Sequence, residues 1–197
     1  MSGGGSTPVR DRPTAAQLEA ELARTKYRAR YRTVLRRTVY TLVIVAAAAV
    51  LVATLWLPVL QIYGNSMTPT LTDGDIVVSV KQSDFQQGDV VAFYYNNKIL
   101  IKRVIAGPGD WVDVKEDGTV FVNGTELDEP YLEEKAFGDC DIDLPYQVPD
   151  GRIFVMGDHR SVSVDSRNTA VGCVAQEQIV GRMVFRVWPL KAMGSIG

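Results

Sequence analysis

This 197-residue chain has few of the residues that hold metal ions or form disulfide frameworks: two cysteines and one histidine. His159 is distant along the chain from both cysteines, so a zinc cluster is not expected. Glycine-rich phosphate loops of the P-loop and dinucleotide-binding types are also missing. The sequence therefore predicts neither a metal nor a cofactor. Its 46% hydrophobic and 22% charged residues are ordinary for a globular protein, which excludes disordered and collagen-like chains.

Charged side chains are missing between Thr38 and Thr72, and residues 39–60 are nearly all apolar. A helix of about 20 such residues crosses the hydrocarbon core of a membrane, so residues 38–60 are predicted to form one transmembrane helix. The run begins too late and is too long for a cleaved secretory signal, which is the main alternative.

Basic residues dominate the segment before this helix. Residues 1–37 carry nine basic and three acidic side chains, whereas the chain after Arg37 has a net charge of −8. By the positive-inside rule, residues 1–37 form a cytoplasmic segment and residues 61–197 form a domain outside the cell (plasma) membrane. A basic segment beside an apolar span favours contact with membrane lipid over contact with nucleic acid.

Beyond the span, short β-branched runs alternate with turns rich in glycine and aspartate. This pattern predicts a mostly β domain built on an antiparallel β-sheet. The predicted strands are residues 76–80, 90–95, 99–105, 111–114, 119–122, 152–156 and 180–187. Residues 123–149 are acidic and irregular, and they are predicted to form a surface excursion.

Two segments of this domain offer a candidate nucleophile and a candidate base. Ser66 lies in a turn just after the span, and Lys102 lies in an apolar strand, on the same face as Leu100 and Val104. Burial there lowers the pKa of the lysine and makes it a base near neutral pH, which a serine nucleophile requires. From the residues alone, a polar membrane-exit loop around Ser66 and a lysine snorkelling at a strand edge stay open as alternatives.

The single histidine offers a different catalytic arrangement. A Ser-His-Asp triad needs a carboxylate that orients the imidazole, but Asp158 is adjacent to His159 and, on an extended chain, points away from it. Asp165 is the other nearby carboxylate. We expect His159 to be a turn residue instead.

Four segments in order resemble the sequence boxes of bacterial type I signal peptidases. They are residues 66–71 (SMTPTL), 88–91 (GDVV), 102–110 (KRVIAGPGD) and 157–167 (GDHRSVSVDSR). Each box alone is a weak signal, whereas the ordered set after an N-terminal span is specific and covers about residues 39–190. The resemblance implies a membrane-bound serine endopeptidase that uses a Ser/Lys dyad to remove signal peptides from exported preproteins.

The resemblance also implies a role for individual residues. Ser66 matches the nucleophile, and Lys102 matches the general base that takes its proton and later returns it to the leaving amine. Ser163 matches a serine whose hydroxyl orients that lysine. The residues that match positions bracing the site are Arg103, Asp158, Asp165 and Arg167. The residues that match the walls of shallow pockets selecting small side chains, in Ala-x-Ala sites, are Ile62, Met67 and Leu71.

Two positions depart from the family pattern. Gly64 stands where some members have a serine that stabilises the oxyanion, and His159 stands where the pattern usually has asparagine. The second oxyanion donor is therefore open, and so is the choice between a Cys140–Cys173 disulfide and two free thiols.

The expected partners are preprotein substrates and membrane lipid, for a monomer near the secretion translocon. Two other functions remain to be separated from this one. They are a self-cleaving repressor-type Ser/Lys protease and a membrane-anchored binding module without catalysis.

Overall fold

The structure is a computed structural model that describes residues 15–56, 58–81 and 84–196. The first part of the predicted basic segment, residues 1–14, lies outside the described residues. The chain divides after Val52 into two compact units.

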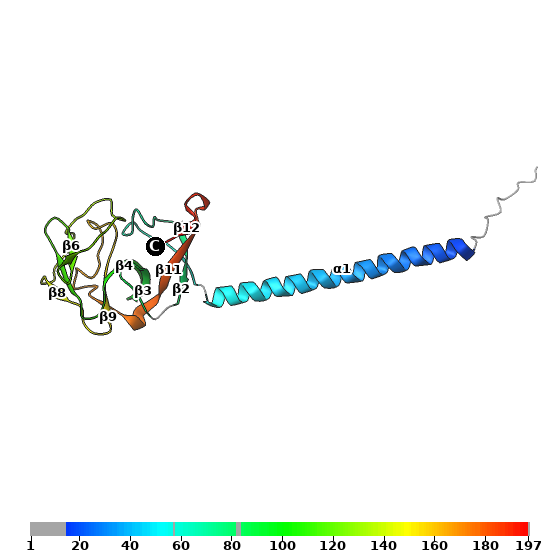
Figure 1. Ribbon diagram of the computed structural model, residues 1–197, viewed down its shortest axis with the longest axis horizontal. Helices are drawn as coiled ribbons and strands as arrows, with labels where there is room; N and C mark the ends of the chain where they lie inside the picture. Colours follow the sequence, from blue (N-terminus) through cyan, green and yellow to red (C-terminus); the bar gives the residue numbers. More distant parts are fainter. Residues whose placement is uncertain (1–14, 57, 82–83, 197) are drawn as a thin grey trace, which may run out of the picture. The chain divides into compact units, whose positions relative to one another are not determined.

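One long helix, α1, runs from Ala15 to Trp56 and includes most of the basic segment as well as the apolar run (Figure 1). Within it, Arg30–Leu51 is long and apolar enough to cross a membrane, with a mean hydropathy of 1.8 and none of its surface buried. The helix has the length and the composition that the predicted membrane span requires.

The apolar run does not stay helical to residue 60. Val59–Gln61 forms strand β1, which pairs with Ile76–Val80, strand β2. The prediction that Val59 and Leu60 belong to the membrane helix was therefore wrong. Both the helix and β1 are apolar here, so composition does not mark the change, whereas pairing with β2 does. The carbonyl oxygen of Pro58 anchors the junction by accepting hydrogen bonds from the backbone N and Oγ of Ser79.

The larger sheet has eight strands, and all of its pairings are antiparallel. Besides β1 and β2 it contains β3 (Val90–Tyr95), β4 (Lys98–Ala106), β9 (Arg152–Met156), β10 (Val174–Ala175), β11 (Ile179–Trp188) and β12 (Gly194–Ser195). Their order is β1-β2-β11-β3-β4-β9-β10, with β12 beside β11. The sheet thereby brings the early strands of the domain beside the late strand β11.

A smaller antiparallel sheet has the order β7-β6-β5-β8. Its strands are β5 (Trp111–Val114), β6 (Val120–Val122), β7 (Thr125–Glu126) and β8 (Tyr146–Gln147). Two short 3-10 helices flank β11, namely Gln176–Gln178 and Leu190–Ala192. The predicted mostly antiparallel β domain is confirmed, and each of the seven predicted strands is present to within one residue at either end.

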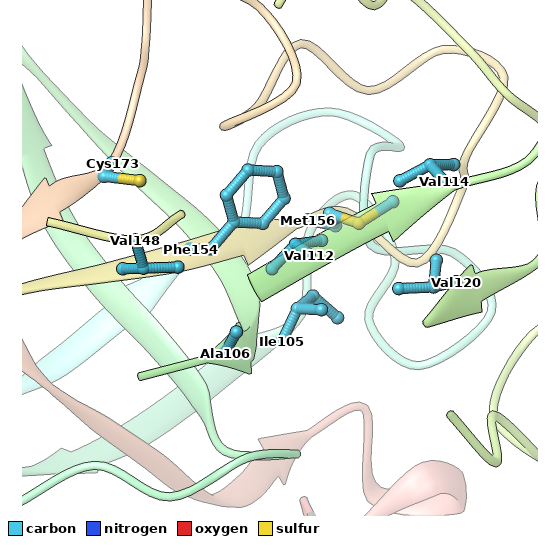
Figure 2. Close-up of a cluster of buried hydrophobic side chains, with 9 residues drawn as sticks. All are labelled: Ile105, Ala106, Val112, Val114, Val120, Val148, Phe154, Met156 and Cys173. Atoms are coloured by element: carbon cyan, nitrogen blue, oxygen red, sulfur yellow. The ribbon is translucent and has the colours of Figure 1, made fainter. Parts of the chain in front are cut away.

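An apolar cluster joins the two sheets. Ile105 and Ala106 from β4 and Phe154 and Met156 from β9 pack with Val112, Val114 and Val120 of the smaller sheet (Figure 2). Removing this much apolar surface from water is the main favourable contribution to folding, at roughly 25 cal/mol per Å². The cluster fixes β4, which carries Lys102, against the rest of the domain.

Residues 123–149 pack more tightly than a surface excursion would. Leu127, Phe137, Ile142 and Leu144 lie against the same apolar cluster, and Glu129 is buried. The prediction of a surface excursion was wrong for these residues. They show no strand or helix periodicity in sequence, because their contacts are tertiary, and a periodicity argument therefore passes over them.

Candidate active site

Strand β4 carries Lys102 into the interior of the domain. Lys102 pairs across the sheet with Val91, and only 2% of its surface is exposed. Val91 and Val104, which lie on the same face by strand alternation, are also buried. The expectation of an apolar environment for this lysine therefore holds.

Ser66 lies in a tight turn after β1. Gly64 enters the turn with φ of +90°, a conformation that L-residues rarely adopt, and its backbone N donates to Asp73 Oδ1 at 2.7 Å. The turn continues with hydrogen bonds from Thr68 N to Asn65 O and from Leu71 N to Met67 O. Ser66 is consequently presented at the surface of the domain while staying partly buried.

The structure brings the two predicted catalytic side chains together, although 36 positions separate them in sequence. Lys102 Nζ donates a hydrogen bond to Ser66 Oγ at 2.6 Å. Burial lowers the pKa of Lys102 from 10.5 to about 8; Asp165 and Asp158 oppose that shift, and Arg167 adds to it. An amine with this pKa is partly neutral near physiological pH, so it can accept the serine proton.

Ser163 lies next to this pair. It is buried, and its Oγ has no hydrogen-bond partner within the described part of the chain. A Cβ built on Gly157 would lie 2.3 Å from Ser163 Oγ and 2.5 Å from the carbonyl oxygen of Ser66, so Ser163 and Ser66 approach each other across this glycine. The predicted hydrogen bond from Ser163 to Lys102 is not formed, and its orienting role stays a prediction.

The four predicted bracing residues form two buried ion pairs. Arg103 Nε and Nη2 bind Asp158 Oδ1 and Oδ2 at 2.9 and 2.7 Å. Arg167 Nε and Nη2 bind Asp165 Oδ1 and Oδ2 at 2.8 and 2.9 Å. Buried charges persist only when paired and hydrogen-bonded, and such pairs are better at fixing geometry than at stabilising a fold.

A groove of about 810 Å³ opens beside Ser66. Residues 59–64 form one wall and residues 97–101 the other, and Ser66 and Met67 lie at its floor. Two of the predicted pocket residues, Ile62 and Met67, line this groove. Leu71 is fully buried in the core next to them and does not line it.

Comparison with known proteins gives one family. The family described as "Signal peptidase, peptidase S26" matches residues 35–188, most of the chain. The chain belongs to the signal peptidase S26 family. As a signal peptidase it is a serine endopeptidase that cleaves signal peptides from secreted preproteins. Family membership does not support the two alternatives, a repressor-type protease and a binding module without catalysis.

Two relatives by sequence agree with this assignment. Signal peptidase IB of Staphylococcus aureus (strain COL) is 42% identical over 148 residues, which cover 65% of this chain and 76% of that protein. Thylakoidal processing peptidase 1, chloroplastic, of Arabidopsis thaliana is 39% identical over 146 residues, which cover 66% of this chain and 41% of that protein. A crystal structure of a signal peptidase I from Enterococcus faecalis V583 is 30% identical, with a TM-score of 0.43, covering 50% of this chain and 96% of that one.

The structure shows the local conformation of Gly64 and His159, the two positions of this signal peptidase that depart from the family pattern. Gly64 has a left-handed backbone, so a serine at this position would be strained. His159 is a turn residue, as predicted, and its carbonyl accepts hydrogen bonds from Val162 N and Ser163 N. Its own backbone N donates to the carbonyl oxygen of Ser66 at 3.0 Å, which connects this turn to the turn that contains Ser66.

Sequence reasoning missed two residues beside the site of this signal peptidase, Glu129 and Tyr131. Arg160 forms a buried ion pair with Glu129, and the ring of Tyr131 lies 3.9 Å below the guanidinium of Arg103. Glu129 and Tyr131 belong to the segment that was predicted to be a surface excursion. An acidic residue in a segment without periodicity gives no sequence signal that its carboxylate is buried.

The two cysteines of the signal peptidase are free. Cys173 is buried against the smaller sheet, where burial raises the pKa of its thiol to about 11, while Cys140 is half-buried. The alternative of two free thiols therefore holds, and the thiol of Cys173 is unreactive at neutral pH.

Proposed function

We propose that this signal peptidase works through a Ser66/Lys102 dyad and cleaves after small side chains in sites of the Ala-x-Ala type. The single observation that carries the proposal is the 2.6 Å contact between Lys102 Nζ and Ser66 Oγ, made by a lysine that is almost fully buried. An exposed lysine would stay cationic at neutral pH and could not act as the base.

The dyad chemistry follows from this contact. Neutral Lys102 removes the proton of Ser66 Oγ as the oxygen attacks the scissile carbonyl, forming a tetrahedral oxyanion. The backbone N–H of Ser66 is the nearest donor for that negative charge. The Lys102 ammonium then gives its proton to the leaving amine, and the acyl group stays on Ser66 as an ester. Water, deprotonated by Lys102, hydrolyses the ester and restores the serine.

The walls of the groove are suited to an extended peptide. Within the described sheet, residues 98–102 of β4 pair only with β3, because β9 pairs with β4 from Arg103 onward. Strand β1 pairs only with β2. Each wall therefore presents one open strand edge to the groove, and a peptide lying between them can form backbone hydrogen bonds as an added strand.

Side-chain selection comes from two buried residues that line the groove. Only 3% of the surface of Ile62 and 2% of that of Met67 is exposed. Because the core holds them in place, they cannot move aside for a large group. Small residues, such as alanine, fit above them without overlap. Leu71 belongs to the same buried cluster as Met67, so it acts only indirectly on selection.

We further propose that α1 spans the membrane with its basic end in the cytoplasm, because Arg24, Arg36 and Arg37 and the other basic residues precede the apolar run. β1 begins three residues after the end of α1. Such a short connection spans at most about 10 Å, so little chain separates the end of the helix from the start of the catalytic domain.

The test is cleavage of an exported precursor by the full chain in detergent micelles or vesicles. Ser66→Ala and Lys102→Ala are expected to lower the rate at least a thousandfold, whereas Ser161→Ala and Lys191→Ala, which change exposed residues of the same types outside the groove, are expected to process at the parent rate. If Ser66→Ala or Lys102→Ala cleaves the precursor at the parent rate, the dyad assignment is wrong.

A further inference from the structure

One buried and one half-buried side chain of residues 123–149, Glu129 and Tyr131, contact the arginines that surround the catalytic pair. Glu129 is 8% exposed, and its carboxylate accepts hydrogen bonds from Arg160 Nη1 at 3.2 Å and from Arg160 Nη2. The hydroxyl of Tyr131 donates to the same carboxylate at 2.8 Å. Neither side chain lines the substrate groove, and neither reacts in the dyad chemistry.

Arg160 connects Glu129 to the backbone of the nucleophile. The side chain of Arg160 is fully buried, and its Nε donates to the carbonyl oxygen of Gly157 at 3.1 Å. Between these two residues, His159 donates its backbone N–H to the carbonyl oxygen of Ser66 at 3.0 Å. The ion pair with Glu129 therefore holds the turn of residues 157–160, and that turn holds the peptide unit that follows the nucleophile.

Tyr131 connects the same carboxylate to a second anchor of the nucleophile turn. The centroid of its ring lies 3.9 Å from Cζ of Arg103, and this cation–π contact holds the guanidinium in one orientation. Arg103 Nη2 donates to Thr70 Oγ1 at 3.2 Å, and the hydroxyl of Thr70 donates to Asp158. The turn that presents Ser66 is thus held at Ser66 itself and at Thr70.

We propose that Glu129 is a positioning residue for the cleavage reaction, with Tyr131 as its second support. Through Arg160 it sets the position of Ser66 relative to Lys102, and through Tyr131 it steadies the arginine that follows Lys102 in the chain. The inference rests on the proposed Ser66/Lys102 dyad. Displacing a reacting group by about 1 Å can lower the rate a hundredfold. A remote carboxylate that fixes the position of the nucleophile can therefore affect kcat.

The kinetic signature follows from where the contacts lie. Glu129 acts on the backbone of Ser66, whereas peptide binding depends on the groove walls, residues 59–64 and 97–101. Loss of the Glu129 carboxylate should therefore lower kcat and leave KM unchanged. A carboxylate that only stabilised the fold would change the unfolding temperature and leave the kcat of the folded enzyme unchanged.

The experiment uses the full chain in detergent micelles and an internally quenched peptide with an Ala-x-Ala site. Glu129→Gln keeps the shape of the side chain but turns an amide N–H₂ toward the guanidinium. It is expected to lower kcat by about tenfold to a hundredfold with KM within about twofold of the parent. Asp128→Asn, which neutralises the exposed carboxylate next to it, is the matched control and should keep both constants.

Tyr131→Phe serves as a milder variant in case Glu129→Gln does not fold, because it removes only the hydroxyl that binds Glu129. We expect about a threefold to tenfold fall in kcat at unchanged KM. Parent kcat in both folded variants, or an effect confined to KM, would overturn the proposal. Ser66→Ala is assayed in parallel: activity in that variant refutes the dyad itself, whereas an inactive Ser66→Ala beside a fully active Glu129→Gln refutes only the role of Glu129.

Discussion

Replacing Lys102 with methionine should make this enzyme more stable while abolishing its activity. Burial lowers the pKa of Lys102 from 10.5 to about 8, so at neutral pH the folded protein holds a cation where a neutral group is favoured. A shift of this size corresponds to a cost of about 3 kcal/mol at 1.36 kcal/mol per pKa unit. Methionine has a similar length and no charge, so Lys102→Met should recover up to about that amount at pH 7.

The pH dependence of this gain has a definite sign. Because the pKa of Lys102 is lower in the folded state, the unfolded chain binds more protons between pH 8 and 10.5. The stability of the parent therefore rises with pH across that window. The advantage of Lys102→Met should be complete below about pH 8 and disappear above about pH 10.5.

The measurement is guanidinium unfolding of the full chain in detergent micelles, followed by tryptophan fluorescence at several pH values. Lys98→Met, an exposed lysine on the same strand, is the control and should show no pH-dependent gain. If Lys102→Met is no more stable than the parent at pH 7, or if its gain is the same at pH 7 and pH 11, burial does not destabilise the charged form of Lys102.

Three further predictions concern the site. The kcat/KM of the parent should rise through about pH 8 to a plateau, because a pKa of about 8 leaves about a quarter of Lys102 neutral at pH 7.5, whereas an ordinary lysine would leave about one in a thousand; a flat profile would contradict it. Gly157→Ala should lower kcat at least tenfold, since its Cβ would come within 2.5 Å of the Ser66 carbonyl oxygen, and peptide kinetics on the folded variant test this. Asp158→Asn should cost roughly 3 kcal/mol of stability, measured by chemical unfolding, because it leaves the buried guanidinium of Arg103 without a counter-ion; an unchanged unfolding midpoint would refute the ion-pair argument.

The strands and the candidate dyad were accessible from sequence because each leaves a local signal. β-branched runs between glycine turns mark strands such as Val90–Tyr95, whose bounds agree with the prediction. A lysine inside an apolar strand is an exception to the usual pattern, and the ordered boxes then select Ser66 as its partner. The strand signals depend on neighbours within a few residues along the chain, whereas the choice of Ser66 depends on the family resemblance carried by the four boxes between residues 66 and 167.

Other features depend on contacts between distant segments. Composition alone could not show that the apolar run changes from helix to strand before Val59, because pairing with Ile76–Val80 decides it. It also could not show that Leu71 is packed into the core and does not line the groove. Leu71 lies in a bend, where no strand alternation marks a face, so its burial depends on tertiary contacts in the cluster that contains Ile62 and Met67.

The sequence by itself determined a basic segment, an apolar helix, an antiparallel β domain and the residue types of a Ser/Lys protease, because these follow from composition, periodicity and short motifs. Only the tertiary structure decided that Lys102 lies 2.6 Å from Ser66. It also decided that the hydroxyl of Ser163 has no partner within the described chain and that Glu129 is buried against Arg160. A desolvated charge is defined by everything packed around it, and those atoms come from segments far apart in the chain.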